Sequence, residues 1–245
     1  MPYARHLQVA TLDFMIGDTA PLERETALLA IASTMTADGH FTETVNVLSW
    51  VVREHPKPEM VREVIVQTHL FAGYPRTLNA LEALRQGAEK AGVDISGLRA
   101  EPSEPAITNE QVIERANNLW GRVYGDNAAK VAANAKKLSP DLALWSQIVG
   151  YGRVLSRPEP DALTREFCVV AALIPMDVQP QLKGHVAGVL NLGGTADQLW
   201  QLLSIVKKLL DAPKVLDAAQ RTFEAVLGKK ASDLSLEDEQ KYKWL

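Results

Sequence analysis

Two titratable residues, Glu166 and His185, lie 19 positions apart in a largely apolar part of the 245-residue chain. Each falls in a segment with helical character, and a turn around Pro175 to Pro180 separates the two segments. Consecutive antiparallel helices can place two such side chains opposite one another. A histidine exchanges protons near neutral pH, and a carboxylate can orient it or set its tautomer. The alternative is that His185 is a core or interface histidine without a chemical role.

Arg157 is a candidate for binding an anion. It precedes Pro158, which biases its backbone toward an extended conformation. A guanidinium can hold a carboxylate through two parallel hydrogen bonds. The alternative roles for Arg157 are a helix-end cap and an interface ion pair. Lys183 lies near His185 and is a weaker candidate for the same task.

The chain offers little for redox or metal chemistry. Its single cysteine, Cys168, excludes an intrachain disulfide and a CxxC redox centre. Cys168 lies in an apolar helical run, which favours a buried inert thiol over a nucleophile. We expect no metal and no cofactor, because no metal-ligand spacing joins the histidines, which are His6, His40, His55, His69 and His185.

Composition narrows the class of protein further. Apolar residues make up 47% and charged residues 23% of the chain, with a net charge of −4. Global disorder is therefore excluded, and broad binding to nucleic acid or to an anionic membrane is not expected. No apolar stretch reaches the roughly 18 residues of a membrane span, and the N-terminus lacks the pattern of a signal peptide. We expect a cytoplasmic location.

Helical patterns dominate the sequence and predict an all-α fold. Sustained period-two alternation, the mark of strands, is absent. Prolines, a glycine and polar residues across 93–108 are typical of a linker. The expected helices span residues 21–36, 42–54, 58–72, 75–92, 109–123, 127–138 and 141–149, with a further helical run after Pro158.

An internal repeat underlies this pattern. Arg24-Glu25-Thr26 aligns with Arg165-Glu166-Phe167, and each triplet opens an apolar run. Met35 then aligns with Met176, and Pro75 with Pro213 once a loop three residues longer is allowed in the first half. We interpret this as a duplication. It predicts a first unit at 1–92, a linker at 93–108, a second unit at 109–228 and a charged tail at 229–245.

The repeated unit resembles the carboxymuconolactone decarboxylase and alkylhydroperoxidase D superfamily. The similar segments are PEMVREVIVQTHLFAGYPRTLNALEAL (58–84), the stretch 123–166 with its Ser-Arg-Pro and Thr-Arg-Glu motifs, and GHVAGVLNLGGT (184–195). The resemblance implies two tandem AhpD-like helical units. It also implies a homotrimer of chains that mimics a hexamer of single units.

One difference separates the two branches of this superfamily. In the peroxidase branch a glutamate is followed by a CxxC pair and a histidine at offsets that fall on Val178, Gln181 and His185, counted from Glu166. Neither cysteine is present. The chain therefore looks more like the decarboxylase branch, which implies a cofactor-free lyase acting on a small carboxylated, lactone-like substrate. In that branch His185 would be the acid-base residue, Glu166 its partner, and Arg157, Lys183 and Tyr151 would bind the substrate.

The first half departs further from the pattern. It keeps Glu25, but Thr44 stands where His185 would align, and His40 lies four residues earlier. Glu25 and His40 are candidates for a remnant site. Either one active site survives in the second half or both halves have lost catalysis. Two alternative functions follow, a peroxidase-related antioxidant protein, disfavoured by the missing cysteines, and a non-catalytic helical assembly module.

Overall fold

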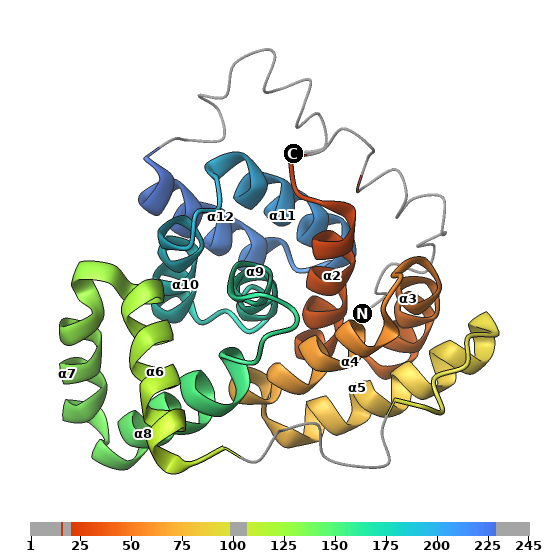
Figure 1. The fold of residues 1–245 in the computed structure, drawn as a ribbon. Coiled ribbons are helices and arrows are strands. Elements are labelled where there is room, and N and C mark those ends of the chain that lie inside the picture. The colour runs from red at the N-terminus through yellow and green to blue at the C-terminus, as the bar shows by residue number, and fades with distance from the viewer. Residues whose placement is uncertain (1–15, 17–20, 99–106, 229–245) are drawn as a thin grey trace.

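The fold is entirely helical in the residues that the structure describes. This computed structural model describes residue 16, residues 21–98 and residues 107–228. Every regular element within them is a helix (Figure 1), so the expected all-α class is confirmed. The expected tail at 229–245 and half of the expected linker, residues 99–106, lie outside the described residues. The tandem duplication and the unit boundaries stay predictions.

The N-terminal part contains α2 (Arg24–Asp38), α3 (Phe41–Glu54), α4 (Pro58–Gln67) and α5 (His69–Ala91). Gly39 ends α2 with a φ of 80°, a left-handed conformation that suits glycine. α3 and α5 cross closely because Gly87 carries no side chain. A Cβ at Gly87 would lie 2.8 Å from the backbone nitrogen of Ser49.

The C-terminal part begins with a helical arm, α6 to α8, and ends with the four helices α9 to α12. Capping boxes, in which a threonine and a glutamine satisfy each other's backbone N–H groups, start α6 at Thr108 and α11 at Thr195. The elements are α6 (Asn109–Tyr124), the 3₁₀ turn η1 (Gly125–Asn127), α7 (Ala128–Leu138), α8 (Pro140–Trp145), the π-helix η2 (Ser146–Leu155), α9 (Ala162–Leu173), α10 (Gln179–Asn191), α11 (Ala196–Leu209) and α12 (Pro213–Leu227).

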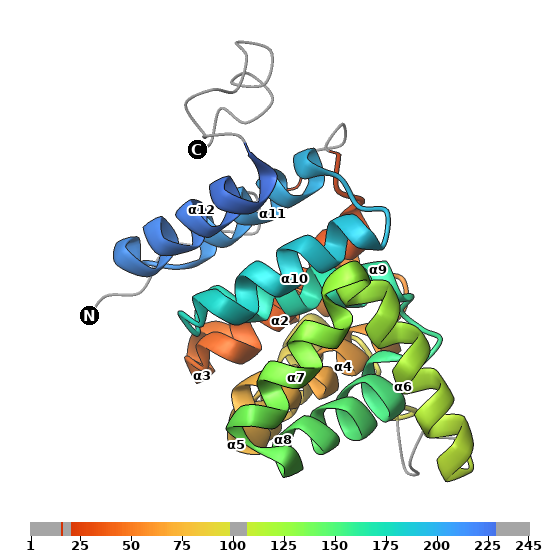
Figure 2. The same cartoon turned by 90° about the vertical axis from the view of Figure 1, so that its left-hand side faces the viewer.

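Two helices, α2 and α9, pack against each other at the centre of the molecule (Figure 1). Both are buried around almost their whole circumference, from Thr26 to Ala37 and from Arg165 to Leu173. Such all-round burial requires helices that are apolar on every face, which explains the apolar runs in the sequence. Figure 2 shows α11 and α12 side by side as an outer layer and the α6–α8 arm on another side of this centre.

Two of the expected helices differ from the prediction in their course. The one expected at 58–72 ends at Gln67, and the chain breaks again at Gly73, whose φ of 79° is not helical. The helix expected at 141–149 continues as the π-helix η2 to Leu155. Gly152 lets this π-helix approach α6, because a Cβ there would lie 2.7 Å from the carbonyl oxygen of Val112. Close backbone packing of this kind is not visible in hydrophobic periodicity.

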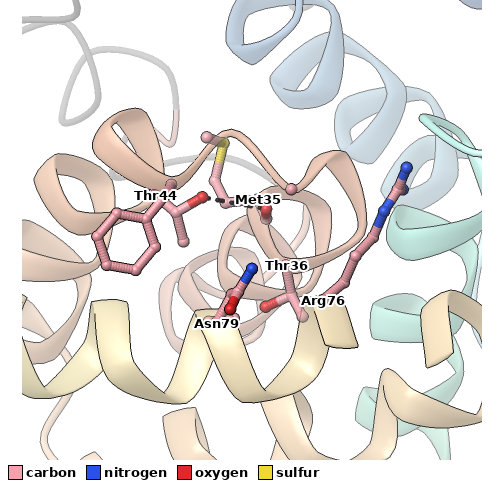
Figure 3. A pocket seen from close by; sticks show the side chains of 8 residues that line it. Met35, Thr36, Thr44, Arg76 and Asn79 are labelled. Atoms are coloured by element: carbon pink, nitrogen blue, oxygen red, sulfur yellow. Dashed lines mark hydrogen bonds between the residues drawn. The ribbon is translucent and has the colours of Figure 1, made fainter. Parts of the chain in front are cut away.

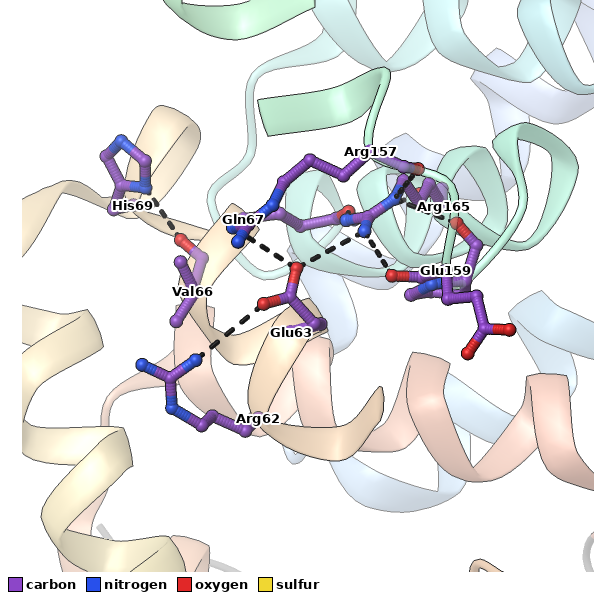
Figure 4. Close-up of polar contacts among 9 residues, drawn as sticks. Arg62, Glu63, Val66, Gln67, His69, Arg157, Glu159 and Arg165 are labelled. Carbon is purple, nitrogen blue, oxygen red and sulfur yellow. Dashed lines mark hydrogen bonds and ion pairs between the residues drawn. The ribbon is translucent and has the colours of Figure 1, made fainter. Parts of the chain in front are cut away.

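A buried arginine ties α9 to α4. Arg165 is 1% exposed, and its guanidinium pairs with Glu63 at 3.3 Å and donates to the side chain of Gln67 at 2.9 Å (Figure 4). It also donates to the backbone carbonyls of Pro160 and Glu159 at 2.9 and 2.6 Å. Gln67 in turn donates to the carbonyl of Arg165. The N-terminus of α9 is thereby fixed to a helix about a hundred residues earlier in the chain.

We expect Arg165→Met to lower the free energy of unfolding by about 3–5 kcal/mol, because several buried acceptors lose their donor at a cost of about 1–3 kcal/mol each. The substitution leaves the Gln67 side chain and the carbonyls of Glu159 and Pro160 without their donor. Urea unfolding measures the change. Arg85→Met is the matched control, because Arg85 pairs with Glu82 and Glu89 on the surface and its loss should leave the urea midpoint nearly unchanged. Equal effects of the two substitutions would contradict the structural role of Arg165.

Candidate functional site

The structure brings Glu166 and His185 into direct contact. Glu166 lies in the first turns of α9 and His185 in the middle of α10, and these helices pack together. His185 Nδ1 and Glu166 Oε1 are 2.6 Å apart, and the two residues are 5% and 3% exposed. A carboxylate at this distance accepts a hydrogen bond from Nδ1–H. Nε2 is then the ring atom available to exchange a proton with a bound molecule.

Gly188 makes room for this pair. It lies three positions after His185 on α10, where the helix meets α9. A Cβ at this position would lie 2.4 Å from Glu166 Oε1. Real Cβ atoms do not approach an oxygen so closely, so the carboxylate occupies space that only a glycine leaves free. Gly184, one turn earlier on α10, has no such constraint, since a Cβ there would meet only the Tyr124 ring at 3.7 Å.

Aromatic rings surround the histidine. The ring of Phe71 from α5 meets the His185 ring edge to face, with centroids 5.7 Å apart. The ring of Tyr124 from α6 lies 6.1 Å from it, and Trp120 and Tyr151 pack against Tyr124. Phe71 and Tyr124 are half-buried, whereas Tyr151 is buried. The pair therefore lies in apolar surroundings, where electrostatic interactions are stronger than in water.

Two tyrosines near the pair are joined through their hydroxyls. Tyr151 donates a hydrogen bond of 2.8 Å to the hydroxyl oxygen of Tyr124. Burial raises the pKa of Tyr124 to about 12, against the opposing effect of this hydrogen bond, and the charge of Glu166 raises it further. Burial also raises the pKa of Tyr151. Both phenols therefore keep their protons at physiological pH and act as hydrogen-bond donors.

Arg157 and Lys183 lie elsewhere. Arg157 Nη1 pairs with Glu63 Oε2 at 3.3 Å, next to Arg165 (Figure 4). The ion-pair alternative therefore describes its observed contact. Lys183 is exposed. Because it precedes His185 by two positions on a helix, its side chain points to nearly the opposite side of α10. Of the residues expected to bind substrate, Tyr151 is the one whose side chain lies beside the pair.

The side chain of Cys168, the single cysteine, is buried and protonated. Cys168 is fully buried in α9, and burial raises its pKa to about 12. A thiolate nucleophile is therefore not formed at neutral pH. Among the described residues, no group of three or more His, Cys, Asp or Glu side chains is placed to hold a metal ion. No helix among them has both the length and the apolar character to cross a membrane.

The region of the first half that the predicted repeat aligns with the His185 site is closely packed. Thr44, which aligns with His185, is buried and donates to the carbonyl oxygens of His40 at 2.7 Å and Met35 at 3.2 Å. Figure 3 shows Thr44 and Met35 beside a cavity of about 10 Å³, enough for about one water molecule. Arg76 reaches in from α5 and donates to the carbonyl of Ala37. No substrate fits in this space.

Glu25 and His40, the candidates for a remnant site in the first half, interact with other residues and not with each other. His40 pairs with Asp38 at 2.6 Å, and its side chain is 42% exposed. Glu25 is exposed at the start of α2, where its charge acts on the buried His55. His55 Nδ1 accepts a hydrogen bond from the backbone of Lys57, and its Nε2 has no hydrogen-bond partner among the described residues. Burial lowers the pKa of His55, and Glu25 partly opposes this effect.

Sequence reasoning missed three aromatic residues of the site. Trp120 and Tyr124 lie four positions apart on α6, a spacing that puts both rings on one helix face. This aromatic pair was a usable signal. Phe71 carries no such signal, because it comes from α5, more than a hundred residues before His185. Only the packing of the two halves shows that it belongs to the site.

Comparisons with known proteins show the family to which the chain belongs. No family model matches it. It is 30% identical over 160 residues to Peroxisomal protein 2 of Schizosaccharomyces pombe, an alignment that covers 64% of this chain and 72% of that protein. The chain belongs to the same family as this fission-yeast protein. It is also 28% identical over 152 residues to Peroxisomal protein 2 of Saccharomyces cerevisiae, and the alignment spans about half of each chain, 54%.

These relatives correct two expectations from the sequence. The expected cytoplasmic location is wrong, because both relatives are named as peroxisomal proteins. The expected carboxymuconolactone decarboxylase function is also wrong, because the chain's family bears the name of a peroxisomal protein and not of a lyase. The peroxidase-related and assembly-module alternatives find no support in the relatives either. A shared Glu-to-His spacing and turn motifs can persist while the reaction changes.

We expect Gly188→Ala to displace Glu166 and to lower the free energy of unfolding by about 1–3 kcal/mol, as overpacking does. Gly184→Ala on the same helix is the matched control. It should be neutral or stabilising by up to about 1 kcal/mol, because alanine favours helix and its methyl group meets an ordinary contact. Urea unfolding reports stability, and the His185 NMR signals report the pairing. Unperturbed His185 signals in Gly188→Ala would contradict the close fit.

We expect His55 to make stability dependent on pH. Its folded pKa lies below the ordinary value of 6.5, so the unfolded chain binds the proton more tightly. The stabilisation is complete above this pH and is lost as the pH falls toward the folded pKa. His55→Asn keeps an acceptor for the Lys57 N–H but does not titrate. Urea midpoints should therefore fall less on acidification than in the parent, and identical slopes would contradict the assignment.

Proposed function

We propose that the chain is a peroxisomal enzyme that transfers a proton at a carbon next to a carbonyl group, without cleaving a carbon–carbon bond. The names of both relatives support the location. The observation that carries the chemistry is the buried contact of 2.6 Å between His185 Nδ1 and Glu166 Oε1, with a pair of protonated tyrosines beside it. This combination places a base and a hydrogen-bond donor close together in apolar surroundings.

His185 is the base in this proposal. Glu166 accepts the Nδ1–H hydrogen bond, which leaves the lone pair on Nε2. Nε2 removes a proton from the carbon, so the C–H bond breaks and an N–H bond forms. The electron pair of the C–H bond moves toward the carbonyl oxygen and gives an enolate. Glu166 stabilises the imidazolium that results, because its carboxylate stays in contact with Nδ1.

Tyr124 is the donor to the developing enolate oxygen. Tyr151 donates to the Tyr124 oxygen, so the proton of Tyr124 is free to point at a bound molecule. With a pKa of about 12 the Tyr124 phenol stays neutral and donates this proton as a hydrogen bond. A prearranged donor of this kind stabilises charge that appears only during the reaction. Imidazolium at His185 then returns its proton to the same carbon or to a neighbouring one.

We also propose an ancestry, an oligomeric state and a substrate class for the chain. The spacing of Glu166 and His185 on consecutive packed helices supports a common ancestry with the carboxymuconolactone decarboxylase and alkylhydroperoxidase D superfamily. A homotrimer of chains follows from that ancestry, and light scattering of the purified protein tests it. The substrate in our proposal is a small carbonyl compound. Immunostaining of the untagged chain against a peroxisomal marker tests the location.

We expect the purified chain to accelerate exchange of protons for deuterons next to the carbonyl group in a panel of small ketones, keto acids and thioesters. His185→Gln should slow this exchange by about a hundredfold or more, the usual contribution of a general base. Tyr124→Phe should slow it by about tenfold to a thousandfold, because the enolate loses its donor. Proton NMR in deuterated buffer follows the exchange directly.

Tyr74→Phe is the matched control for Tyr124→Phe, because Tyr74 is 69% exposed and stacks on His69. It should leave the exchange rate unchanged. Circular dichroism shows whether each variant keeps its helices. Exchange that survives His185→Gln in a folded protein, or no exchange with any compound of the panel, would refute the proposed reaction.

A further inference from the structure

A second concave site lies on another part of the molecule. A groove of about 740 Å³ runs along α6 and is bounded on the other side by the segment Leu155–Leu163, which joins η2 to α9. Leu192, just past α10, also lines it. Neither Glu166 nor His185 is among the described residues that line the groove. Its volume is in the range of known small-molecule sites.

Positive charge is concentrated on one wall of the groove. Arg115 and Arg122 lie seven positions apart on α6, so their side chains share one helix face. Among the described residues, neither guanidinium has an ion-pair partner. Arg157 adds a third guanidinium from the opposite wall, where Glu63 holds it in place at 3.3 Å.

Negative charge in the groove is smaller and partly engaged. Asp161 accepts hydrogen bonds from the backbone N–H and the hydroxyl of Thr164 as the N-cap of α9. Glu114 on α6 is the other carboxylate in the lining. Arg157 is engaged with Glu63 and Asp161 with a helix cap, so Arg115 and Arg122 face Glu114 as the remaining carboxylate of the lining. The groove is therefore suited to an anion.

The remaining lining is apolar. Leu119 and Leu155 are 5% and 4% exposed, and Leu163 and Leu192 are half-buried. These side chains come from four separate segments and lie beside the cationic wall. An anion without an apolar part would leave the exposed surface of Leu163 and Leu192 in water. A ligand with an anionic head and an aliphatic body would bury them and place its charge on the arginines.

We propose that this groove binds an amphipathic organic anion, with its carboxylate or phosphate head on Arg115 and Arg122 and its aliphatic body along the four leucines. The site is independent of the proton-transfer reaction, because it shares no lining residue with the Glu166–His185 pair.

Isothermal titration calorimetry on the full chain tests the proposal. The probes are decanoate and decyl phosphate, which distinguish the two head groups, and decanol and inorganic phosphate, which lack one half of the ligand each. We expect one or both of the amphipathic anions to bind, and decanol and inorganic phosphate to bind at least about tenfold more weakly, as the loss of charge-assisted hydrogen bonds or of apolar burial implies. The phosphate or carboxylate probe that binds more tightly identifies the head group.

Two sets of variants locate the binding. Arg115→Gln with Arg122→Gln should weaken binding of the anions about tenfold or more, and Glu114→Gln should strengthen it. Lys214→Gln with Arg221→Gln removes the same charge from the exposed face of α12, away from the groove, and should change nothing. Equal binding of decanol, equal weakening by the α12 pair, or no binding of either amphipathic anion would overturn the proposal.

Discussion

The burial of α9 is the constraint on which the rest of the structure depends. Its first turns carry Arg165 and Glu166, two charged neighbours in a helix that is otherwise apolar on every face. Their side chains leave the helix in different directions. Arg165 binds Glu63 and Gln67 on α4 and fixes the N-terminus of α9, whereas Glu166 binds His185 on α10. A buried charge is costly without a partner, so each of these contacts holds a neighbouring helix at one place and one rotation.

The positions that the predicted repeat aligns differ in what they do in the two halves of the chain. In the second half the position opposite Glu166 holds a histidine, and Gly188 leaves space for the carboxylate that binds it. In the first half the predicted alignment places Thr44 opposite His185. The Thr44 hydroxyl donates to two backbone carbonyls beside a cavity of about 10 Å³. The first half also supplies Phe71 to the ring of aromatic side chains around His185. It is therefore a wall of the site in the second half.

The sequence predicted features that depend on local interactions, and it did not predict contacts between residues far apart in the chain. Helical periodicity predicted the all-α fold, and the spacing of Glu166 and His185 suggested that they meet. It did not show that Glu63, 94 positions before Arg157, would bind this arginine. The breaks at Thr68 and Gly73 and the π-helix around Gly152 depend on close backbone packing, which apolar patterning does not report. The reaction was misjudged because a resemblance in motif spacing does not determine function. The location was misjudged because the absence of a signal peptide and of a membrane span does not distinguish the cytoplasm from the peroxisome.

The position of the proton on His185 tests the central claim most directly. Nitrogen NMR of the protein labelled in its histidines, in mildly alkaline buffer, distinguishes the two ring nitrogens. If Glu166 accepts a hydrogen bond from His185 at 2.6 Å and leaves a base for catalysis, Nδ1 carries the proton and Nε2 is bare. In Glu166→Gln this preference should weaken. A proton on Nε2 in the parent protein, in either the other tautomer or an imidazolium, would contradict the role we assign to the pair.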